Sequence, residues 1–348
     1  MGRKIAIVLF NLGGPDSQET VQPFLQNLFA DPAILRVPAP VRFVLARLIS
    51  RLRAPSVKEN YAIMKQPGGG SPLRPETEAQ ARALEAALSN LRPGDDFKAF
   101  IAMRYWHPLT RDVARAVEAW EPDETVLLPL YPQYSSTTTG SSLGEWRQRY
   151  RRPTRTICCY PFNTDFIAAH AERIVAAWEK AGQPENVRLL MSAHGLPEKV
   201  VEDGDPYQWQ VEEMAARLVT HLPDSFETRV CYQSRVGPLK WIGPATEDEI
   251  ELAAKAGKTI MIAPIAFVSE HIETLVELDY EYREVAEEFG AQTYITVPAL
   301  GTIDPFIKAL ADEVAASLDG DALLRSCQGG RLCPKAFSDC PFGEAAAQ

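Results

Sequence analysis

Apolar and polar positions alternate along the chain with two different periods. Eight short runs rich in β-branched and aromatic residues have the length of buried strands, and they lie at 4–10, 97–103, 124–131, 154–160, 187–193, 228–233, 259–267 and 292–298. Most segments between these runs have apolar residues spaced three and four apart, which is typical of amphipathic helices. Strands that alternate with helices predict an α/β fold with parallel sheets covered on both faces.

Eight strands at this spacing fit two doubly wound, Rossmann-like halves better than one wide sheet. The length of 348 residues also agrees with two domains. The segment 150–163 is polar and marked by prolines, so we expect the division there. We predict a first domain over 1–155, a second over 156–305, and a terminal region over 306–348 whose helical stretch packs back on the first half.

Composition and missing motifs exclude several classes of protein. With 36 basic and 46 acidic residues the formal charge is −10, which disfavours nucleic acid as a partner. No stretch approaches about 18 uninterrupted apolar residues, and the N-terminal run has the pattern of a strand, so a cytosolic protein is expected. The chain lacks the glycine-rich phosphate loops, the G-x-S-x-G elbow and the H-E-x-x-H pair.

Chemically active side chains follow several of the predicted strands. In open parallel sheets, ligands bind beyond the carboxyl ends of the strands, so these positions are expected to face one cleft. Each residue alone is more often structural than functional, and only their joint position makes a site. They are Arg104, Tyr105 and His107 after one strand, His194 after another, then Ser234 and Trp241, and finally His271 and Glu273.

The segment after the seventh run is strongly acidic. If it is an α-helix, Glu273, Glu277, Glu281 and Glu284 lie four, four and three residues apart and form one row. A solvated helix face is the ordinary explanation for such a row. Half-buried carboxylates held together instead need a cation or protons to relieve their repulsion. The row would suit the passage of divalent ions or protons.

A basic and apolar segment stands out in this acidic protein. Between Ile34 and Arg53, aliphatic residues are mixed with five arginines, and no acidic residue occurs. The segment is either a packed helix with a solvated basic rim or an amphipathic surface for a membrane.

Three of the six cysteines, Cys327, Cys333 and Cys340, lie in the C-terminal tail. In a cytosolic chain such clustering favours a metal site over disulfides. Zinc usually takes closer pairs, whereas a [2Fe–2S] cluster tolerates wider spacing and needs four thiolates. Cys231, inside a predicted strand, is expected to be a small buried apolar residue.

Seven long blocks of the chain resemble the ferrochelatases, enzymes that insert ferrous iron into a porphyrin to make haem. In the family's order they are "NLGGPDS", "GGGSPLRPET", "RYWHPLT", "YPQYSSTTTGSSL", "SAHGLPEKVVEDGDPY", "YQSRVGPLKWIGPATEDEI" and "PIAFVSEHIETLVELDYEY". The resemblance implies the chelatase fold, with a porphyrin cleft between two Rossmann-like domains. It also implies a lyase that converts protoporphyrin IX and Fe²⁺ into haem and needs no nucleotide.

The resemblance assigns roles to matching positions. His194 would accept protons from the pyrrole nitrogens, a step that suits imidazole. His271 and Glu273 would bind iron or relay protons, and Glu277 and Glu281 would continue that path outward. The matching substrate-binding positions are Leu12, Phe29, Tyr61, Tyr105 and Trp241 along the macrocycle, with Arg53, Ser234 and Arg104 near the propionates or in the cleft.

The resemblance also bears on the tail and on the basic segment. Some ferrochelatases hold a [2Fe–2S] cluster with three C-terminal cysteines and one internal cysteine. The spacings here are wider than in the animal enzymes, and the internal position falls near Ala169. We therefore predict Cys158 as the fourth ligand, with its neighbour Cys159 as the alternative. The basic segment matches the family's hydrophobic lip, which implies peripheral membrane contact, and cluster-bearing members imply a homodimer.

Two other functions stay open. A related enzyme could use coproporphyrin III, whose extra propionates would call for a more basic cleft. A non-catalytic tetrapyrrole or metal carrier would need no proton acceptor at His194.

Overall fold

The chain forms two compact units in the computed structural model, which describes residues 2–235 and 237–344. The first unit is Met1–Cys158 with Leu310–Arg325, and the second is Cys159–Ala309 with Ser326–Gln348. The first boundary lies inside the proline-marked segment 150–163.

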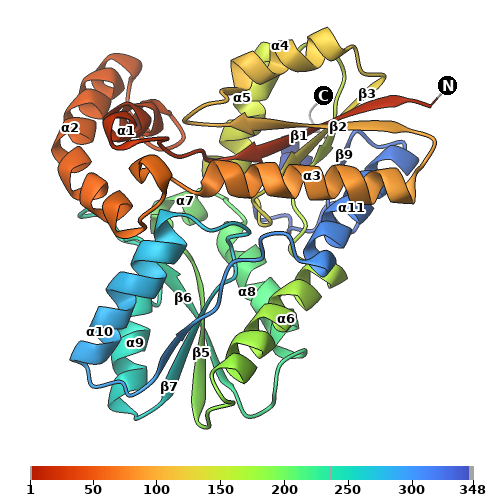
Figure 1. Cartoon of the computed structure of the whole chain (residues 1–348). Coiled ribbons are helices and arrows are strands. Elements are labelled where there is room, and N and C mark those ends of the chain that lie inside the picture. The colour runs from red at the N-terminus through yellow and green to blue at the C-terminus, as the bar shows by residue number, and fades with distance from the viewer. Residues whose placement is uncertain (1, 236, 345–348) are drawn as a thin grey trace. The chain divides into compact units, whose positions relative to one another are not determined.

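The first unit contains a five-stranded parallel sheet in the order β2-β1-β3-β4-β9 (Figure 1). The strands are β1 (Lys4–Asn11), β2 (Asp96–Met103), β3 (Glu124–Pro129), β4 (Arg155–Ile157) and β9 (Leu324–Arg325). Its helices are α1 (Val21–Ala30), α2 (Ala39–Ile63), α3 (Leu73–Leu91), α4 (Thr110–Trp120) and α5 (Ser141–Arg149). Shorter helical segments are η1 (Gln18–Thr20), η2 (Pro67–Gly69) and η3 (Ser136–Gly140).

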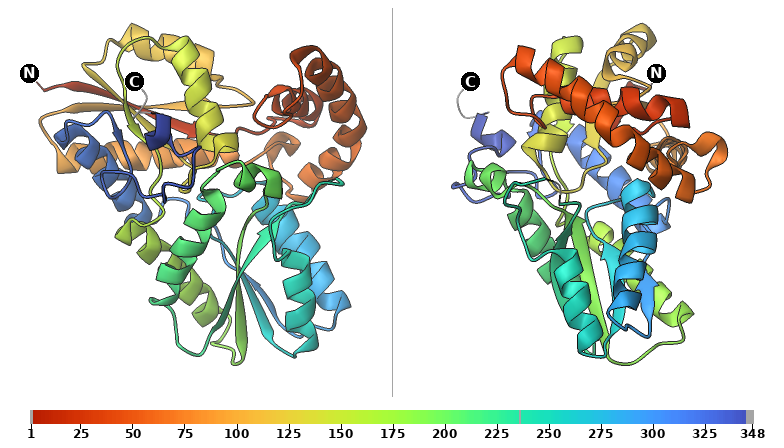
Figure 2. Two further views of the ribbon diagram at one scale, coloured as in Figure 1. Left: turned by 180° about the vertical axis from the view of Figure 1, so that it is seen from behind. Right: turned by 90° about the vertical axis from the view of Figure 1, so that its left-hand side faces the viewer.

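Helices cover both faces of this sheet, with α4 and α5 on one face and α3 on the other (Figures 1 and 2). The strand β1, which lies between β2 and β3, is buried from Ile5 to Asn11, as expected for a parallel strand with two covered faces. Phe10 packs edge-on against Trp146 of α5, with 5.8 Å between ring centroids. This packing fixes the carboxyl end of β1.

The second unit contains a four-stranded parallel sheet in the order β6-β5-β7-β8. The strands are β5 (Val187–His194), β6 (Glu227–Gln233), β7 (Thr259–Pro264) and β8 (Tyr294–Thr296). The helical elements are α6 (Thr164–Lys180), α7 (Glu198–Glu202), α8 (Tyr207–Val219), α9 (Thr246–Lys255), η4 (Glu273–Glu281), α10 (Tyr282–Glu288) and α12 (Pro341–Glu344). Figure 2 shows α6 and α8 on one face and α9 with α10 on the other.

All eight predicted strands are present, and the two doubly wound parallel sheets confirm the predicted fold class. The two-residue strand β9 was not predicted, because it has no apolar run of its own. Cys231 is fully buried on β6 and packs with Ile250 and Ile262, as expected for a small apolar residue. The last long helix, α11 (Asp304–Asp319), begins in the second unit and contributes its residues from Leu310 onward to the first.

Candidate active site

The carboxyl ends of β5, β6 and β7 bring the predicted catalytic residues of the second unit together. His194 is the last residue of β5, Ser234 follows β6, and His271 and Glu273 follow β7. Since these three strands are parallel neighbours, their ends lie at one edge of the sheet.

Glu273 lies between the two histidines. Its Oε2 atom is 3.8 Å from Nε2 of His194 and 3.7 Å from Nε2 of His271. The Oε2 atom is buried, and neither it nor the buried Nδ1 of His271 has a hydrogen-bond partner among the described residues. Buried polar atoms in this state are uncommon and frequently mark a functional site.

The two neighbouring histidines determine the protonation state of Glu273. Burial alone raises the pKa of this carboxyl, but the nearby imidazoles of His194 and His271 outweigh burial and lower the pKa to about 2. The carboxylate therefore stays ionised at neutral pH, available to a cation or to a protonated imidazole.

His194 presents a defined nitrogen. Its Nδ1 is 2.6 Å from the carbonyl oxygen of Gly195. A carbonyl can only accept, so Nδ1 carries the hydrogen and Nε2 is the basic nitrogen of the neutral ring. The side chain is 39% exposed, whereas that of His271 is 8% exposed. His194 is thus the more accessible base.

Glu277 is held by four hydrogen bonds. Its Oε1 accepts from the backbone N–H of Ser234 at 2.7 Å and from the Tyr282 hydroxyl at 3.0 Å. Its Oε2 accepts from the Ser234 hydroxyl at 2.5 Å and from Gln233 at 3.0 Å. The Ser234 hydroxyl, matched by sequence to a propionate contact, is thus committed to Glu277 in this structure.

The acidic segment is not the regular α-helix that the sequence predicted. Glu273–Glu281 forms a π-helix, and α-helical geometry begins only at Tyr282. π-Helical turns inside helices are rare and occur often at functional sites. Exposure increases along the acids, since Glu273, Glu277 and Glu281 are half-buried and Glu284 is exposed. The four acids therefore do not form a straight α-helical row.

Two neighbours of this site were missed at the level of sequence. Gln233 accepts from Ser192 on β5 and donates to Glu277, so it joins the sheet to the π-helix. Tyr207 bonds to the backbone of His194, and burial together with the carboxylate of Glu273 raises the pKa of its hydroxyl. Both residues lie within or next to the quoted motifs, but no local pattern marks their long-range contacts.

In the first unit, Asp31 organises two of the predicted substrate-binding residues. Its Oδ2 is 2.8 Å from the Arg104 guanidinium and accepts from the Tyr105 hydroxyl at 2.8 Å. Ser141 also donates to Oδ2, and Arg104 Nε donates to Ser141 at 2.7 Å. Asp31 is 5% exposed. This buried carboxylate was not singled out from the sequence.

The remaining predicted contacts are distributed over both units. Tyr61 is buried, Leu12 and Phe29 are half-buried, and Arg53 is exposed on α2. The carbonyl of Leu12 accepts from the N–H of Tyr105 at 3.0 Å. In the second unit Trp241 is half-buried, and its indole N–H is buried without a partner among the described residues.

Cysteines gather around the buried amide of Gln210 in the second unit. The Nε2 atom of Gln210 is 3.1 Å from Sγ of Cys333 and 3.7 Å from Sγ of Cys159. A hydrogen bond from Cys333 is the main cause that lowers the pKa of Cys340 to about 6. The N–H of Cys327 donates to the carbonyl of Cys159 at 3.1 Å.

The same group can be tested against a metal site. Thiols with one lowered pKa are the right donors for an iron–sulfur cluster. Cys158 belongs to the first unit, where its N–H donates to the Arg325 carbonyl at 2.8 Å. Within residues 2–235 and 237–344, no three His, Cys, Asp or Glu side chains converge on a ready-made metal position.

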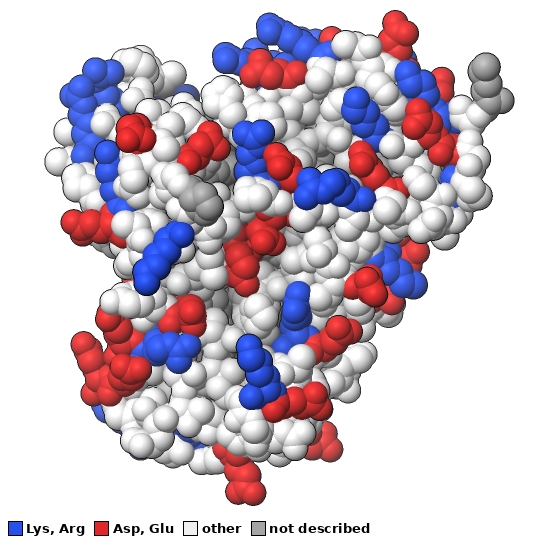
Figure 3. All heavy atoms as spheres, in the orientation of Figure 1, with Lys and Arg blue, Asp and Glu red and all other residues white. Residues whose placement is uncertain are grey.

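The helix α2 turns its large apolar residues outward. Its buried residues are mainly small, with Ala46, Ser50 and Ala54 on the inner face. The exposed large apolar residues of this helix are Val41, Phe43, Val44, Leu48, Leu52 and Ile63, from 36% to 71% exposed. Basic side chains lie over this part of the molecule, at the upper left of Figure 3. No helix in the described part of the chain is both long and apolar enough to span a bilayer.

Comparison with known proteins places these two parallel-sheet units, with histidine and carboxylate groups at the strand ends, in the class of metal chelatases. A solved structure titled "SirB from Bacillus subtilis with Fe3+" has a similar fold, with a TM-score of 0.52 at 11% identity over 91% of this chain and 96% of that one. The ferrochelatase family model matches residues 4–318. The chain belongs to the ferrochelatase family, so the resemblance noted from the motifs is confirmed, and it is an enzyme of the metal-chelatase type.

Curated relatives match nearly the whole chain. A ferrochelatase of Hyphomonas neptunium is 61% identical over 99% of this chain and 96% of its own length. A ferrochelatase of Caulobacter vibrioides is 58% identical over the full length of both.

Proposed function

We propose that this protein inserts Fe²⁺ into protoporphyrin IX, whose two pyrrole N–H groups lose their protons as iron binds the four nitrogens. The observation that carries this proposal is the Glu273 carboxylate between His194 and His271. A metallation site needs a base for the leaving protons and negative charge for the entering cation, and this group supplies both.

His194 is the proton acceptor in this proposal. Its Nε2 is the basic nitrogen of the neutral ring and faces Glu273, which would stabilise the imidazolium formed after proton transfer. Glu273 itself is a poor proton store, because its pKa of about 2 keeps it ionised. It therefore suits iron or the imidazolium, and Glu277 and Glu281 extend the negative charge outward.

Substrate contacts are assigned in the same proposal. Tyr105 and Arg104, held by Asp31, would meet the porphyrin together with Leu12, Phe29 and Tyr61, and Trp241 would do so in the second unit. Arg53 and Ser234 would lie near the propionates. The apolar outer face of α2 favours protoporphyrin IX over coproporphyrin III, because protoporphyrin IX has fewer propionates and is more hydrophobic.

Anaerobic metallation tests the function directly. The protein is mixed with Fe²⁺ and either protoporphyrin IX or coproporphyrin III, and the free-base absorbance bands are followed. We expect turnover with protoporphyrin IX, and a His194→Ala variant that still binds porphyrin but metallates it about 100-fold more slowly or worse. Normal metallation by this variant would support the carrier alternative.

The tail cysteines are assigned to a [2Fe–2S] cluster, which would supply a one-electron redox centre when bound. Cys327, Cys333 and Cys340 would hold it with one thiolate of the Cys158–Cys159 doublet. The sequence favoured Cys158, whereas the shared contact with Gln210 supports Cys159.

The cluster is tested apart from activity. Anaerobically purified protein should be coloured and contain equal amounts of iron and inorganic sulfide, whereas zinc without sulfide would contradict the assignment. Cys158→Ser and Cys159→Ser, measured separately, identify the fourth ligand as the one whose loss removes the sulfide.

The outer face of α2 is assigned to peripheral contact with a membrane surface. Exposed aliphatic and aromatic residues next to arginines favour anionic lipid. The homodimer implied by resemblance remains a prediction, which light scattering of the purified protein would check.

A further inference from the structure

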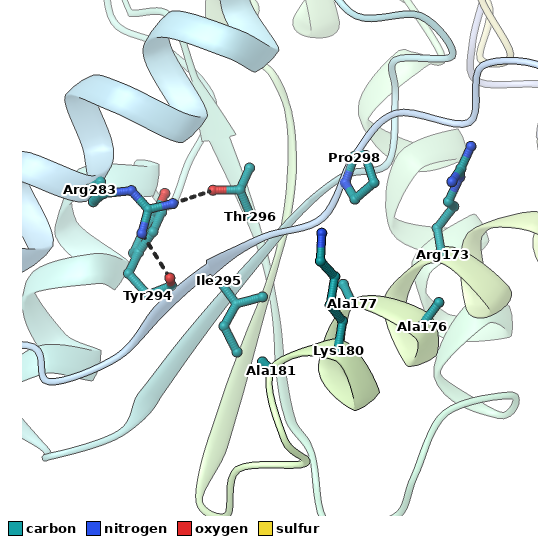
Figure 4. Close-up of a pocket in the computed structure, with 10 residues that line it drawn as sticks. All are labelled: Arg173, Ala176, Ala177, Lys180, Ala181, Arg283, Tyr294, Ile295, Thr296 and Pro298. Atoms are coloured by element: carbon teal, nitrogen blue, oxygen red, sulfur yellow. Dashed lines mark hydrogen bonds between the residues drawn. The ribbon is translucent and has the colours of Figure 1, made fainter.

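An open surface cavity of about 470 Å³ lies on the second unit, at the edge strand β8, and its lining does not include His194 or Glu273. It is formed by the C-terminal half of α6, the start of α10 and the segment from Tyr294 to Pro298 (Figure 4). Its size falls in the range of small-molecule sites. None of the established or proposed roles of this protein uses it.

Small side chains create the hollow. Ala176, Ala177 and Ala181 line the α6 side, while Ile295 and Pro298 line the opposite side. A helix face of alanines next to an edge strand leaves room that larger residues would fill. The floor is therefore apolar, and it would accept an aliphatic or aromatic body.

Three cationic side chains surround this floor, and no lining residue is acidic. Arg283 is already engaged, since it donates to the Tyr294 carbonyl at 2.9 Å and to Thr296, and pairs with Asp279 at 2.8 Å. Lys180 is exposed at the end of α6, and none of the ion pairs among the described residues includes it. The charge of Arg283 is therefore neutralised by Asp279, whereas the charge of Lys180 is available to a ligand.

Arg173 provides further unused hydrogen-bonding capacity. One of its terminal nitrogens donates to the Leu300 carbonyl at 3.0 Å, while its Nε is buried without a partner among the described residues. A guanidinium has five N–H donors, a positive charge and no acceptor, and the carbonyl of Leu300 does not neutralise that charge. Arg173 and Lys180 are seven residues apart on α6, two turns along one face.

We propose that this cavity is a binding site for a small organic anion with an apolar body and one charged headgroup, such as a medium-chain carboxylate. The apolar floor would hold the body, and Lys180 would hold the headgroup, with Arg173 two turns away adding positive charge. A multiply charged inorganic anion fits less well, because the floor offers it no polar partner and Arg283 is already paired.

Calorimetric titration of the full chain at low ionic strength tests the site, with octanoate as the probe. Octyl glucoside supplies the same chain without charge, and inorganic phosphate supplies charge without the chain. We expect one molecule of octanoate per chain and at least about tenfold weaker binding of the other two. Equal binding of octyl glucoside or of phosphate would overturn the proposal.

Two variants of the cavity and two control variants locate the binding. Lys180→Glu removes an exposed cation, and Ala177→Leu fills the floor without changing charge, so each should weaken octanoate binding at least about tenfold. Lys255→Glu on α9 is the matched charge reversal and should leave binding unchanged. Leu52→Glu on α2 should also leave it unchanged, which separates the cavity from the apolar face of α2.

Binding that Lys180→Glu and Ala177→Leu both leave intact would overturn the assignment. These measurements need no porphyrin or iron, so their outcome is independent of the proposed metal insertion.

Discussion

Ser234 donates both its backbone N–H and its hydroxyl to the carboxylate of Glu277, at 2.7 and 2.5 Å. The two residues are 43 positions apart, and their contact ties the loop after β6 to the π-helix after β7. Glu277 is therefore a structural anchor for the candidate site as well as one of its acids.

Replacing Glu277 by Gln should destabilise the protein by about 1–3 kcal/mol, because an amide cannot accept from all four present donors. Glu284→Gln, an exposed change on α10, is the control and should alter stability by less than about 0.5 kcal/mol. Urea denaturation measures both. A Glu277→Gln variant as stable as the wild type would show that these hydrogen bonds are not maintained in solution.

Glu273 should make stability depend on pH in a defined window. Its pKa in the folded protein is about 2, below the ordinary value of 4.5. Its contribution is therefore fully present above pH 4.5 and is lost as the pH falls toward 2. We expect Glu273→Gln to cost up to about 3 kcal/mol at pH 6, with a deficit that shrinks below pH 4.5.

Denaturation of wild type and Glu273→Gln at a series of pH values provides this comparison. A deficit that stayed constant down to pH 3 would mean that the Glu273 pKa is not lowered by the two histidines.

Asp31 should act as a positioning residue for Tyr105 and Arg104. Asp31→Asn leaves the half-buried guanidinium of Arg104 without its counter-charge and should cost up to about 3 kcal/mol of stability. Asp112→Asn removes the partner of an exposed arginine, Arg111, and should cost less than about 1 kcal/mol.

The same variant has a kinetic signature. If Asp31 only positions substrate contacts, Asp31→Asn raises KM for the porphyrin and changes kcat little. Tyr105→Phe, which removes one of the bonds to Asp31, should give a smaller rise. A fall in kcat with unchanged KM would contradict a positioning role.

The outer face of α2 should decide membrane binding. Val44 and Leu52 are 63% and 71% exposed, so changing both to Glu removes apolar contact and adds repulsion without disturbing the core. We expect at least about tenfold weaker binding to vesicles that contain anionic lipid. Leu252→Glu, at a 55% exposed position on α9, is the control. Flotation of protein with vesicles measures the effect.

Much of the fold could be predicted because its signal is local. The run 4–10 is continuous and apolar, as a parallel strand covered on both faces requires, and it became β1. β9 could not be predicted in this way, since two residues leave no pattern and their pairing with β4 depends on the rest of the sheet.

The sequence predicted where in the fold the candidate site lies, but it did not predict the local geometry of the site. Strand ends placed His194, His271 and Glu273 at one edge, but the periodicity of the acids predicted an α-helix where a π-helix occurs. Hydrogen-bond register inside a helix is set by tertiary contacts, here by the bonds of Glu277 to Ser234 and Gln233. Asp31 was missed because its partners Tyr105 and Ser141 are 74 and 110 positions away.

From Ala46 to Ala54 the inner face of α2 is made of small residues, whereas its outer face carries large apolar ones, and this difference decides how the helix tolerates mutation. On most surface helices, replacing an inward residue by a larger or a polar one lowers stability, whereas outward positions tolerate most substitutions. On α2, an inward change such as Ala46→Leu should disrupt the packing of this helix on its neighbour α1, because the buried position leaves no space for the added atoms. Outward changes should pass every test of folding, so a screen for stability alone would classify Leu52 as dispensable.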